Sequence, residues 1–141
     1  MNVLPARIAQ LKKQGFRLTK LRSAMLRVLT ETARPMSAAE LTEKLGLSPT
    51  PHKTSLYREL DFFVAQAIVQ AVDFNDGVRR FEMRDRHHHH LICRLCKTVR
   101  DVELPETLFL QEKKIAKLFG FRDVEHSLEF FGLCTRCAAR A

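Results

Sequence analysis

Hydrophobic positions in the first 66 residues recur at intervals of three and four, the spacing of one face of an α-helix. The pattern predicts four helices, the first ending near Gly15. The apolar positions that define them are Leu4, Ile8 and Leu11; Leu21, Ala24, Met25, Val28 and Leu29; Ala38, Leu41 and Leu45; and Leu56, Leu60, Phe63 and Val64.

Polar residues and proline predict where these helices begin. Thr19 is suited to cap the second helix, because its hydroxyl can accept a bond from a backbone N–H of the first turn. Ser37 and Glu40 have the spacing of a capping box at the start of the third. We expect Thr50 to cap the fourth helix and Pro51 to be its first residue.

Two strand-like runs follow, at residues 68–74 and 78–83, joined by Asn75-Asp76-Gly77. An Asp-Gly turn between such runs is typical of a β-hairpin. Helices followed by a two-stranded wing indicate a winged helix-turn-helix, whose second helix enters the major groove of DNA. We expect residues 1–85 to form this domain.

The remaining residues predict a β-β-α-β order, with strands at 88–93, 98–103 and 124–131 and a helix at 105–119. In the last strand, alternation would place Val124, His126, Leu128 and Phe130 on one face. The fold class is therefore α+β, with a winged-helix domain followed by a small α/β domain at 86–141.

Composition excludes several classes. The 141 residues are 45% hydrophobic and 28% charged, which is ordinary for a globular protein and unlike a disordered one. No apolar stretch approaches the roughly 20 residues of a membrane span. A charged segment followed by an apolar core, as in a signal peptide, is not seen at the start. We therefore expect a cytoplasmic protein without a membrane partner.

Positive charge is concentrated in the first half. Residues 1–86 hold 15 Lys and Arg against 9 Asp and Glu, and residues 87–141 hold 9 against 7. Residues 1–30 contain seven basic side chains and no acidic one. Such a region favours a polyanionic partner, most often nucleic acid. The alternative is a solvated basic face without a partner.

Four cysteines form two pairs, Cys93-x2-Cys96 and Cys134-x2-Cys137. Two such knuckles suit a closed tetrahedral Zn²⁺ site, which would clip together a domain with a small core. An iron–sulfur cluster and a redox or metal-free state are the alternatives. A closed four-cysteine site has no open position for catalysis.

Four consecutive histidines, His87 to His90, precede the first knuckle. In an extended strand His87 and His89 point to one side and His88 and His90 to the other, so two ions, one per face, are expected. Candidate partners of His88 and His90 are Glu82 and Asp101. Candidate partners of His87 and His89 are His126 with Glu106 or Glu112. The alternative is a solvated polar strand beside an unrelated core histidine.

Together these motifs resemble the ferric-uptake-regulator (Fur) superfamily of bacterial metal-dependent repressors. The resemblance rests on five segments: Leu18-Thr19-x-x-Arg22, Thr54-Ser55-Leu56-Tyr57-Arg58-Glu59-Leu60, His87-His88-His89-His90-Leu91-Ile92-Cys93-x-x-Cys96, Gly120-Phe121-x-x-x-x-His126-Ser127-Leu128, and Cys134-x-x-Cys137.

The resemblance implies a homodimer that binds palindromic, double-stranded operator DNA and represses when metal is bound. It implies structural zinc on Cys93, Cys96, Cys134 and Cys137. It suggests a regulatory site of Glu82, His88, His90 and Asp101, and a second site of His87, His89 and His126. It places Tyr57 and Arg58 on the DNA-reading helix, and Thr19 and Arg22 near the DNA backbone. The residues themselves add His52, Lys53 and Ser55 at the start of that helix, where base contacts are usual.

Departures from the family pattern bear on the metal. Iron sensors of the family usually have a histidine just before the third helix, where this chain has Ala33-Arg34-Pro35-Met36. His89 stands where iron sensors commonly have aspartate, and this feature and the stretch 121–126 look more like zinc-uptake regulators. Zinc sensors, however, often have cysteine where Glu82 stands, and the glycine usual after the second knuckle cysteine is Lys97. We expect Zn²⁺ as the regulatory ion, with Fe²⁺ or Mn²⁺ as the alternative.

Enzymatic function is not expected. A zinc deaminase would show H-x-E followed by P-C-x-x-C, and neither motif is present. Motifs of serine hydrolases, zinc proteases, P-loop proteins and dinucleotide-binding proteins are also missing from the sequence. A remaining alternative is a metal-binding protein that does not bind DNA.

Overall fold

The computed structural model describes residues 3–105 and 107–140. The chain divides into two compact units, with the boundary between Arg86 and His87. Each unit combines helices with a three-stranded sheet. Within the described ranges, none of the helices has the length and apolarity that crossing a bilayer requires.

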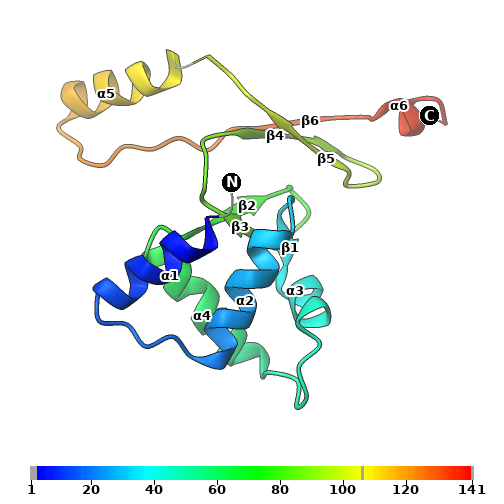
Figure 1. The fold of residues 1–141 in the computed structure, drawn as a ribbon. Helices are drawn as coiled ribbons and strands as arrows, with labels where there is room; N and C mark the ends of the chain where they lie inside the picture. Colours follow the sequence, from blue (N-terminus) through cyan, green and yellow to red (C-terminus); the bar gives the residue numbers. More distant parts are fainter. Residues whose placement is uncertain (1–2, 106, 141) are drawn as a thin grey trace. The chain divides into compact units, whose positions relative to one another are not determined.

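The first unit is a winged helix-turn-helix (Figure 1). Its helices are α1 (Leu4–Lys13), α2 (Lys20–Glu31), α3 (Ala38–Leu45) and α4 (Lys53–Ala65). Its strands are β1 (Met36–Ser37), β2 (Val69–Asp73) and β3 (Arg79–Met83), in the order β1-β3-β2 with antiparallel pairing. β1 was not expected, because two residues are too few to show strand alternation.

Two of the expected helix caps are present. The Thr19 hydroxyl accepts a hydrogen bond from the Arg22 backbone N–H at 3.1 Å. At the start of α3 the Ser37 hydroxyl accepts from the Glu40 N–H at 3.2 Å, and the Glu40 carboxylate accepts from the Ser37 N–H at 2.8 Å. This reciprocal pair is a complete capping box.

The expected start of α4 is wrong. The helix begins at Lys53 with His52 as N-cap, and no side chain caps it. His52 has an extended backbone (φ −61°, ψ 140°), so Thr50 and Pro51 lie in the preceding loop. The Leu56 N–H donates to the His52 carbonyl oxygen at 3.0 Å and closes the first turn. Helical backbone angles thus begin only at Lys53, and the first carbonyl that accepts a helical bond is that of His52.

A single hydrophobic core joins the helices and the sheet of this unit. Side chains that are at most 1% exposed come from α2, α3, α4 and β3, including Met25, Leu41, Phe63 and Phe81. On α4 the buried residues repeat at helical spacing, so the opposite face of the helix is held toward solvent.

The second unit contains β4 (His89–Cys93), β5 (Val99–Val102), α5 (Thr107–Phe119), β6 (Glu129–Gly132) and α6 (Thr135–Ala138). The strand order is β5-β4-β6, with β4 antiparallel to β5 and parallel to β6. The predicted β-β-α-β order is confirmed, whereas the one-turn helix α6 was not expected.

The predicted last strand is too long. β6 covers residues 129–132 rather than 124–131, and pairing with β4 begins at His90 opposite Glu129. His126 therefore lies in the loop before the strand, and of the four residues expected on one strand face only Phe130 belongs to the strand. The reason is tertiary: the His126 backbone N–H donates to the Glu112 carboxylate of α5 at 2.9 Å instead of to a neighbouring strand.

Candidate metal centres and nucleic-acid interface

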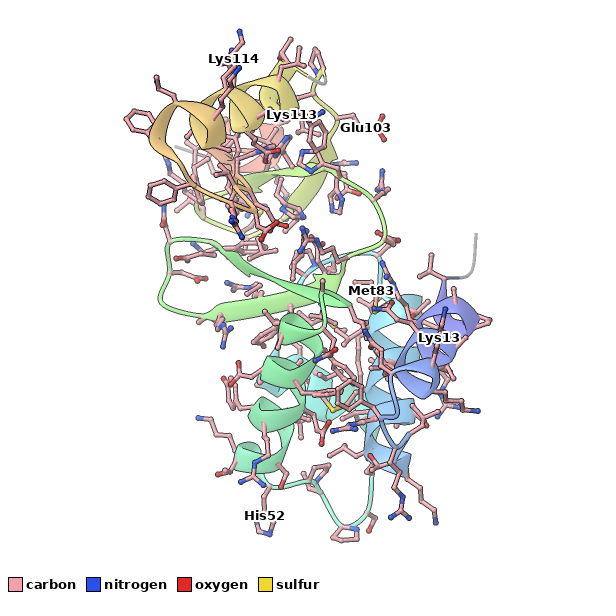
Figure 2. All side chains as sticks on the ribbon, turned by 90° about the vertical axis from the view of Figure 1, so that its left-hand side faces the viewer. Lys13, His52, Met83, Glu103, Lys113 and Lys114 are labelled. Atoms are coloured by element: carbon pink, nitrogen blue, oxygen red, sulfur yellow. The ribbon has the colours of Figure 1, made fainter. Side chains whose placement is uncertain are left out.

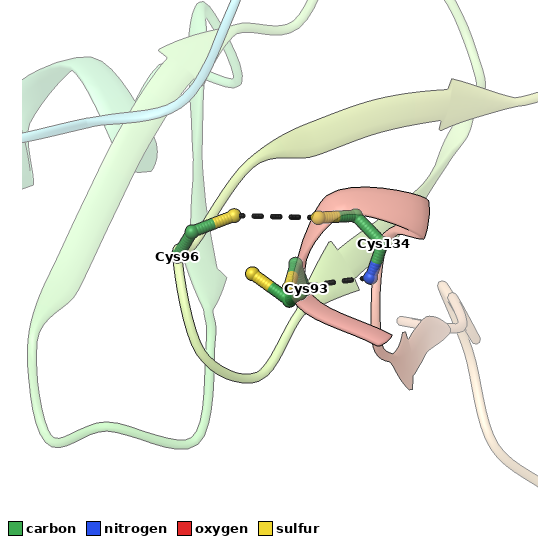
Figure 3. Close-up of side chains that lie close together, drawn as sticks. Cys93, Cys96 and Cys134 are labelled. Atoms are coloured by element: carbon green, nitrogen blue, oxygen red, sulfur yellow. Dashed lines mark hydrogen bonds between the residues drawn. The ribbon is translucent and has the colours of Figure 1, made fainter. Parts of the chain in front are cut away.

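The four cysteines converge at one end of the second unit, as three of them show in Figure 3. Cys93 ends β4, Cys96 lies in the following turn, and Cys134 and Cys137 belong to α6 and its cap. The four sulfur atoms all lie within 4.8 Å of one another, and Cys96 Sγ is 3.7 Å from Cys134 Sγ. A tetrahedral zinc site with Zn–S bonds of about 2.3 Å needs sulfur atoms about 3.8 Å apart, so the cluster fits that ion.

The local backbone shapes the first knuckle. Lys97 has a positive φ of 59°, and its N–H donates to the Cys93 carbonyl oxygen at 3.0 Å. The left-handed conformation favours glycine, which is the residue that the family pattern has at this position. The turn brings Cys96 back toward Cys93, and the Cys134 N–H donates to Cys93 Sγ at 3.4 Å.

Electrostatics divide the four thiols. The hydrogen bond with Thr98, at 3.1 Å, lowers the pKa of Cys96 to about 5. A bond from the Cys134 backbone N–H lowers the pKa of Cys93. A side-chain hydrogen bond with Cys134, and then burial, raise the pKa of Cys137 to about 12. A bound divalent metal ion would favour the thiolate form, which is the form that binds metal. All four are free cysteines in the structure.

A second cluster combines His87, His89 and His126, whose ligand nitrogens lie within 4.8 Å of one another. His89 Nε2 is 3.5 Å from His126 Nε2. Burial, and then the neighbouring charges of His87 and His126, lower the pKa of His89. The lowered pKa favours the neutral imidazole, which is the form that binds metal.

Glu112 completes this cluster. Its carboxylate lies 2.6 Å from His126 Nδ1, which leaves the Nε2 side of the ring toward His89. A carboxylate behind a histidine ligand is a common arrangement in metal sites, because it sets the tautomer and the ring orientation. Of the two acidic residues considered from the sequence, Glu112 is thus in place, and Glu106 lies outside the described residues.

His88 and His90 form the other histidine pair, with ring centroids 4.9 Å apart. On β5, Asp101 stands directly opposite His90 in the antiparallel register, so the pleat places Asp101 on the same face of the sheet as this pair. Glu82 belongs to the first unit, where it lies on β3 with only 6% of its surface exposed. Within the second unit, two imidazoles and the Asp101 carboxylate are thus on one face, and imidazole and carboxylate donors suit Zn²⁺, Fe²⁺ or Mn²⁺.

The exposed face of α4 carries the residues expected to read DNA. His52, Lys53, Ser55 and Arg58 are exposed, while Leu56, Leu60 and Phe63 are buried on the opposite side. Figure 2 shows the His52 side chain pointing away from the body of the unit at the start of the helix. Tyr57 is half-buried, with its ring against Phe81 and the Lys53 ammonium 5.9 Å from its centroid.

Thr19 and Arg22, expected near the DNA backbone, take part in internal contacts. The Thr19 hydroxyl is the cap of α2. The Arg22 guanidinium donates to Glu59 at 2.6 Å and to the Arg17 carbonyl oxygen at 2.8 Å, and lies 3.9 Å from the centre of the Phe62 ring. The sequence identifies Arg22 as a basic residue but does not predict its contacts with Glu59, Arg17 and Phe62.

Residues 13–131 match the model of the ferric uptake regulator family. The chain belongs to this family. The match confirms the resemblance seen in the motifs of the chain, which is therefore a metalloregulator of the Fur family.

Relatives with known names agree with this assignment to the Fur family. The ferric uptake regulation protein of Bacillus subtilis is 33% identical over 93% of this chain and 94% of its own length. The solved Helicobacter pylori ferric uptake regulator Fur has a TM-score of 0.74 at 24% identity, covering 96% of this chain and 91% of that one. A zinc uptake regulator, solved in complex with zinc and DNA, has a TM-score of 0.72 at 24% identity, covering 98% and 94%. The last two likenesses concern the fold.

Proposed function

We propose that this Fur-family protein is a cytoplasmic, homodimeric transcriptional repressor that binds double-stranded operator DNA when zinc occupies its regulatory site. The observation that carries the proposal is the exposed polar face of α4, backed by a rigid apolar core. A helix of this kind in a winged helix-turn-helix enters the major groove with its first turns. The seven basic side chains in residues 1–30 supply charge for phosphate contacts.

Residues 1–85 are the proposed DNA-binding domain, and residues 86–141 the proposed metal-binding and dimerisation domain. Within the latter, Cys93, Cys96, Cys134 and Cys137 hold structural zinc, and His87, His89 and His126 hold a second ion with Glu112 behind His126. Glu82, His88, His90 and Asp101 bind the regulatory ion. Because Glu82 belongs to the DNA-binding domain, an ion bound by this set restricts how that domain moves relative to the other.

Dimerisation is supported by the exposed apolar surface of the second unit. Of the described helix α5, Thr107–Phe119, no side chain is buried. Leu118 is 76% exposed and Phe121 is 69% exposed. A unit of this size has a small core, and exposed apolar surface on such a unit is typical of an interface. We propose that a second copy of the chain buries it.

Zinc is preferred to Fe²⁺ or Mn²⁺ on two features of the chain. The segment Ala33–Met36 offers no histidine, which leaves a smaller ligand set, and zinc accepts four ligands where the other two ions commonly take six. His89 provides an imidazole where iron sensors have a carboxylate. The carboxylates Glu82 and Asp101 favour the iron- or manganese-responsive alternative.

The test measures metal content and DNA binding together. The protein is analysed for metal per chain before and after mild chelation, and each form is titrated with DNA from upstream of its own coding sequence. We expect one zinc to resist chelation and a second ion to be lost along with DNA binding, which zinc then restores at low free concentration. Recovery only with Fe²⁺ or Mn²⁺ would assign the alternative metal. DNA binding that ignores the second ion would contradict the repressor mechanism.

Two variants locate the functions. His88→Ala/His90→Ala is expected to stay a folded dimer that keeps its cysteine-bound zinc but no longer responds to added metal. Tyr57→Ala/Arg58→Ala is expected to load metal normally and to lose operator binding. If the histidine variant unfolds, these histidines are structural; if the helix variant binds DNA as before, α4 is not the reading helix.

A further inference from the structure

Thr98 makes two hydrogen bonds to the sulfur of Cys96. The Thr98 hydroxyl oxygen is 3.1 Å from Cys96 Sγ, and the Thr98 backbone N–H bonds to the same sulfur. A thiolate bound to a metal carries no hydrogen, so the hydroxyl is the donor of this bond when the cysteines hold an ion. Both contacts lie within the second unit and do not depend on the first.

The backbone of Thr98 is fixed by the hairpin that carries the first knuckle. Its carbonyl oxygen accepts a hydrogen bond from the Cys93 N–H at 3.0 Å. The next residue, Val99, pairs with Ile92 of β4. The main chain therefore holds the hydroxyl beside Cys96, although Thr98 itself is exposed.

Arg136 reaches the same sulfur from the second knuckle. It lies between Cys134 and Cys137 in α6, and its guanidinium hydrogen-bonds to Cys96. The charges of the cluster also act on this guanidinium. Cys96 is thus bonded to both segments that form the cysteine cluster.

Hydrogen bonds to a thiolate lower its reactivity. The thiolate is the nucleophilic form of cysteine, and its nucleophilicity falls as the basicity of the sulfur falls. A donor on the sulfur withdraws electron density from it and also fixes its direction toward the ion. Four thiolates around one divalent ion leave an excess of negative charge, which the Arg136 guanidinium offsets in part.

Cys134 provides a comparison within the cluster. Like Cys96 it is half-buried, so reagents in solution have similar access to the two sulfurs. Among the described residues, the partners of Cys134 Sγ are Cys96 Sγ, at 3.7 Å, and Cys137. These sulfurs have no hydrogen to donate when the ion is bound. Two thiolates of similar exposure therefore differ in the hydrogen bonds that they accept.

We propose that Thr98 and Arg136 are positioning residues that hold the Cys96 sulfur by hydrogen bonds and thereby make zinc on the cysteine cluster slow to leave and Cys96 slow to react with electrophiles. The inference rests on the zinc proposed for these cysteines. It adds two residues that bind no metal themselves, and it assigns Cys134 as the sulfur that electrophiles modify first.

The test uses Thr98→Val, which removes the hydroxyl at similar size, and Arg136→Met, which removes the guanidinium. Thr135→Val and Arg140→Met are the matched controls. Both residues are exposed, one in α6 and one just after it, and neither side chain bonds to a sulfur among the described residues. Thr98→Ser keeps the hydroxyl and should behave as the parent. All variants are full-length and carry zinc on the cysteines alone after mild chelation.

The first measurement is the rate at which a strong chelator removes this zinc. We expect Thr98→Val and Arg136→Met each to lose zinc about 10-fold faster than the parent. This is the lower end of the effect that losing a partner of a metal ligand usually has, because both residues are exposed. The two controls and Thr98→Ser should match the parent.

The second measurement identifies which sulfur reacts. Substoichiometric N-ethylmaleimide is added, and the modified peptides are identified by mass spectrometry. The thiolate sulfur bonds to one carbon of the maleimide double bond, and the other carbon takes a proton from water. The chain has four cysteines, so every modified thiol belongs to the cluster. We expect Cys134 to be modified first in the parent, and the ratio of modified Cys96 to modified Cys134 to rise several-fold in Thr98→Val.

The ratio separates a hydrogen bond to Cys96 from a general loosening of the fold, which would speed both reactions alike. Unchanged zinc loss in Thr98→Val and Arg136→Met, or a parent modified at Cys96 before Cys134, would overturn the inference. An effect in only one of the two variants would overturn the role of the other residue. Should Thr98→Val fail to fold, Arg136→Met and its control decide by the rate of zinc loss.

The parent protein separates this inference from the proposed function. A parent that holds no zinc after mild chelation would contradict both the zinc proposed for the cysteines and the role of Thr98 and Arg136. A parent that holds one zinc per chain, with variants that lose it at the same rate, would contradict only the inference.

Discussion

Arg22 is the residue whose expected role and observed contacts differ most. Its side chain is only 17% exposed, and it ion-pairs with Glu59 of α4 while lying over Phe62 of the same helix. A guanidinium used in this way braces α4 against α2 through one charge-assisted bond and one cation–π contact. Its expected contact with the DNA backbone stays a prediction, and bracing is a second way in which it can affect DNA binding.

Substitutions of Arg22 and Glu59 distinguish bracing of α4 from a contact between Arg22 and a DNA phosphate. If Arg22 braces α4, Arg22→Ala and Glu59→Gln break the same pair and both weaken operator binding, with little change in its salt dependence. A phosphate contact by Arg22 predicts that Arg22→Ala reduces the salt slope by about 0.9 for each subunit, or about 1.8 for the dimer, and that Glu59→Gln strengthens binding because a negative charge is removed. Fluorescence anisotropy at a series of salt concentrations measures both quantities.

The capping box of α3 predicts a pH-dependent contribution to stability. Burial alone would raise the pKa of Glu40, but hydrogen bonds from the Ser37 backbone and from Arg34 outweigh it, and the pKa is lowered from 4.5. A lowered carboxyl pKa stabilises the fold above the unfolded pKa, and this contribution is lost as the pH falls through the folded value. Glu40→Gln should therefore destabilise the protein at neutral pH and converge with the parent below pH 4.5.

Ser37→Ala tests the other half of the same box. It should cost about 1 kcal/mol of unfolding free energy, the usual effect of removing an N-cap hydroxyl. Urea unfolding followed by circular dichroism measures the unfolding free energies of both Ser37→Ala and Glu40→Gln. Equal stability of Glu40→Gln and the parent at neutral pH would show that the negative charge of Glu40 contributes nothing there, because glutamine can still complete the capping box.

At the scale of elements, the zinc proposed for the cysteine cluster is expected to stabilise the second unit. β4 and the turn after it carry two of the cysteines, α6 and its N-cap carry the other two, and few large side chains among the described residues of this unit are buried. Cys93→Ser should remove one zinc per chain and unfold the second unit, because binding of structural zinc supplies much of the folding free energy. Leu95→Ser, in the same turn and 65% exposed, is the control and should keep its zinc.

The readouts are elemental analysis and the loss of far-ultraviolet circular dichroism. The first unit has its own core, so its helical signal should remain in Cys93→Ser. A variant that keeps full zinc content and a cooperative transition would show that Cys93 is not a ligand.

At the scale of the whole molecule, the exposed apolar residues of the second unit predict self-association. Leu118→Glu places a charge on this surface and should convert the dimer to a monomer, with weaker operator binding because a palindromic site is read by two subunits. Lys117→Glu, the neighbouring exposed position of α5, is the control for added negative charge. Sedimentation velocity distinguishes the two states, and a Leu118→Glu protein that stays dimeric would place the interface elsewhere.

Local patterns were sufficient for much of this protein. Helical spacing and the residues Thr19, Ser37 and Glu40 predict α2 and α3 with their caps, because such signals act within one turn of chain. The paired cysteines predict their cluster, because the spacing within each knuckle is itself the constraint. Alternation in His87–His90 likewise separates two histidine pairs.

Contacts between distant segments decided the rest. The extended backbone of His52 moves the start of α4 past Thr50 and Pro51, and the bond from the His126 backbone to Glu112 keeps that histidine out of β6. The partners of Arg22 and Gln70 lie 37 and 12 residues away along the chain, so the helix and strand periodicity of the sequence does not predict them. The sequence by itself determined most of the elements, the family and the clusters of side chains that could hold a metal ion. Only the tertiary structure decided which neighbours orient them, because hydrogen bonds and packing depend on positions in space and not on spacing along the chain.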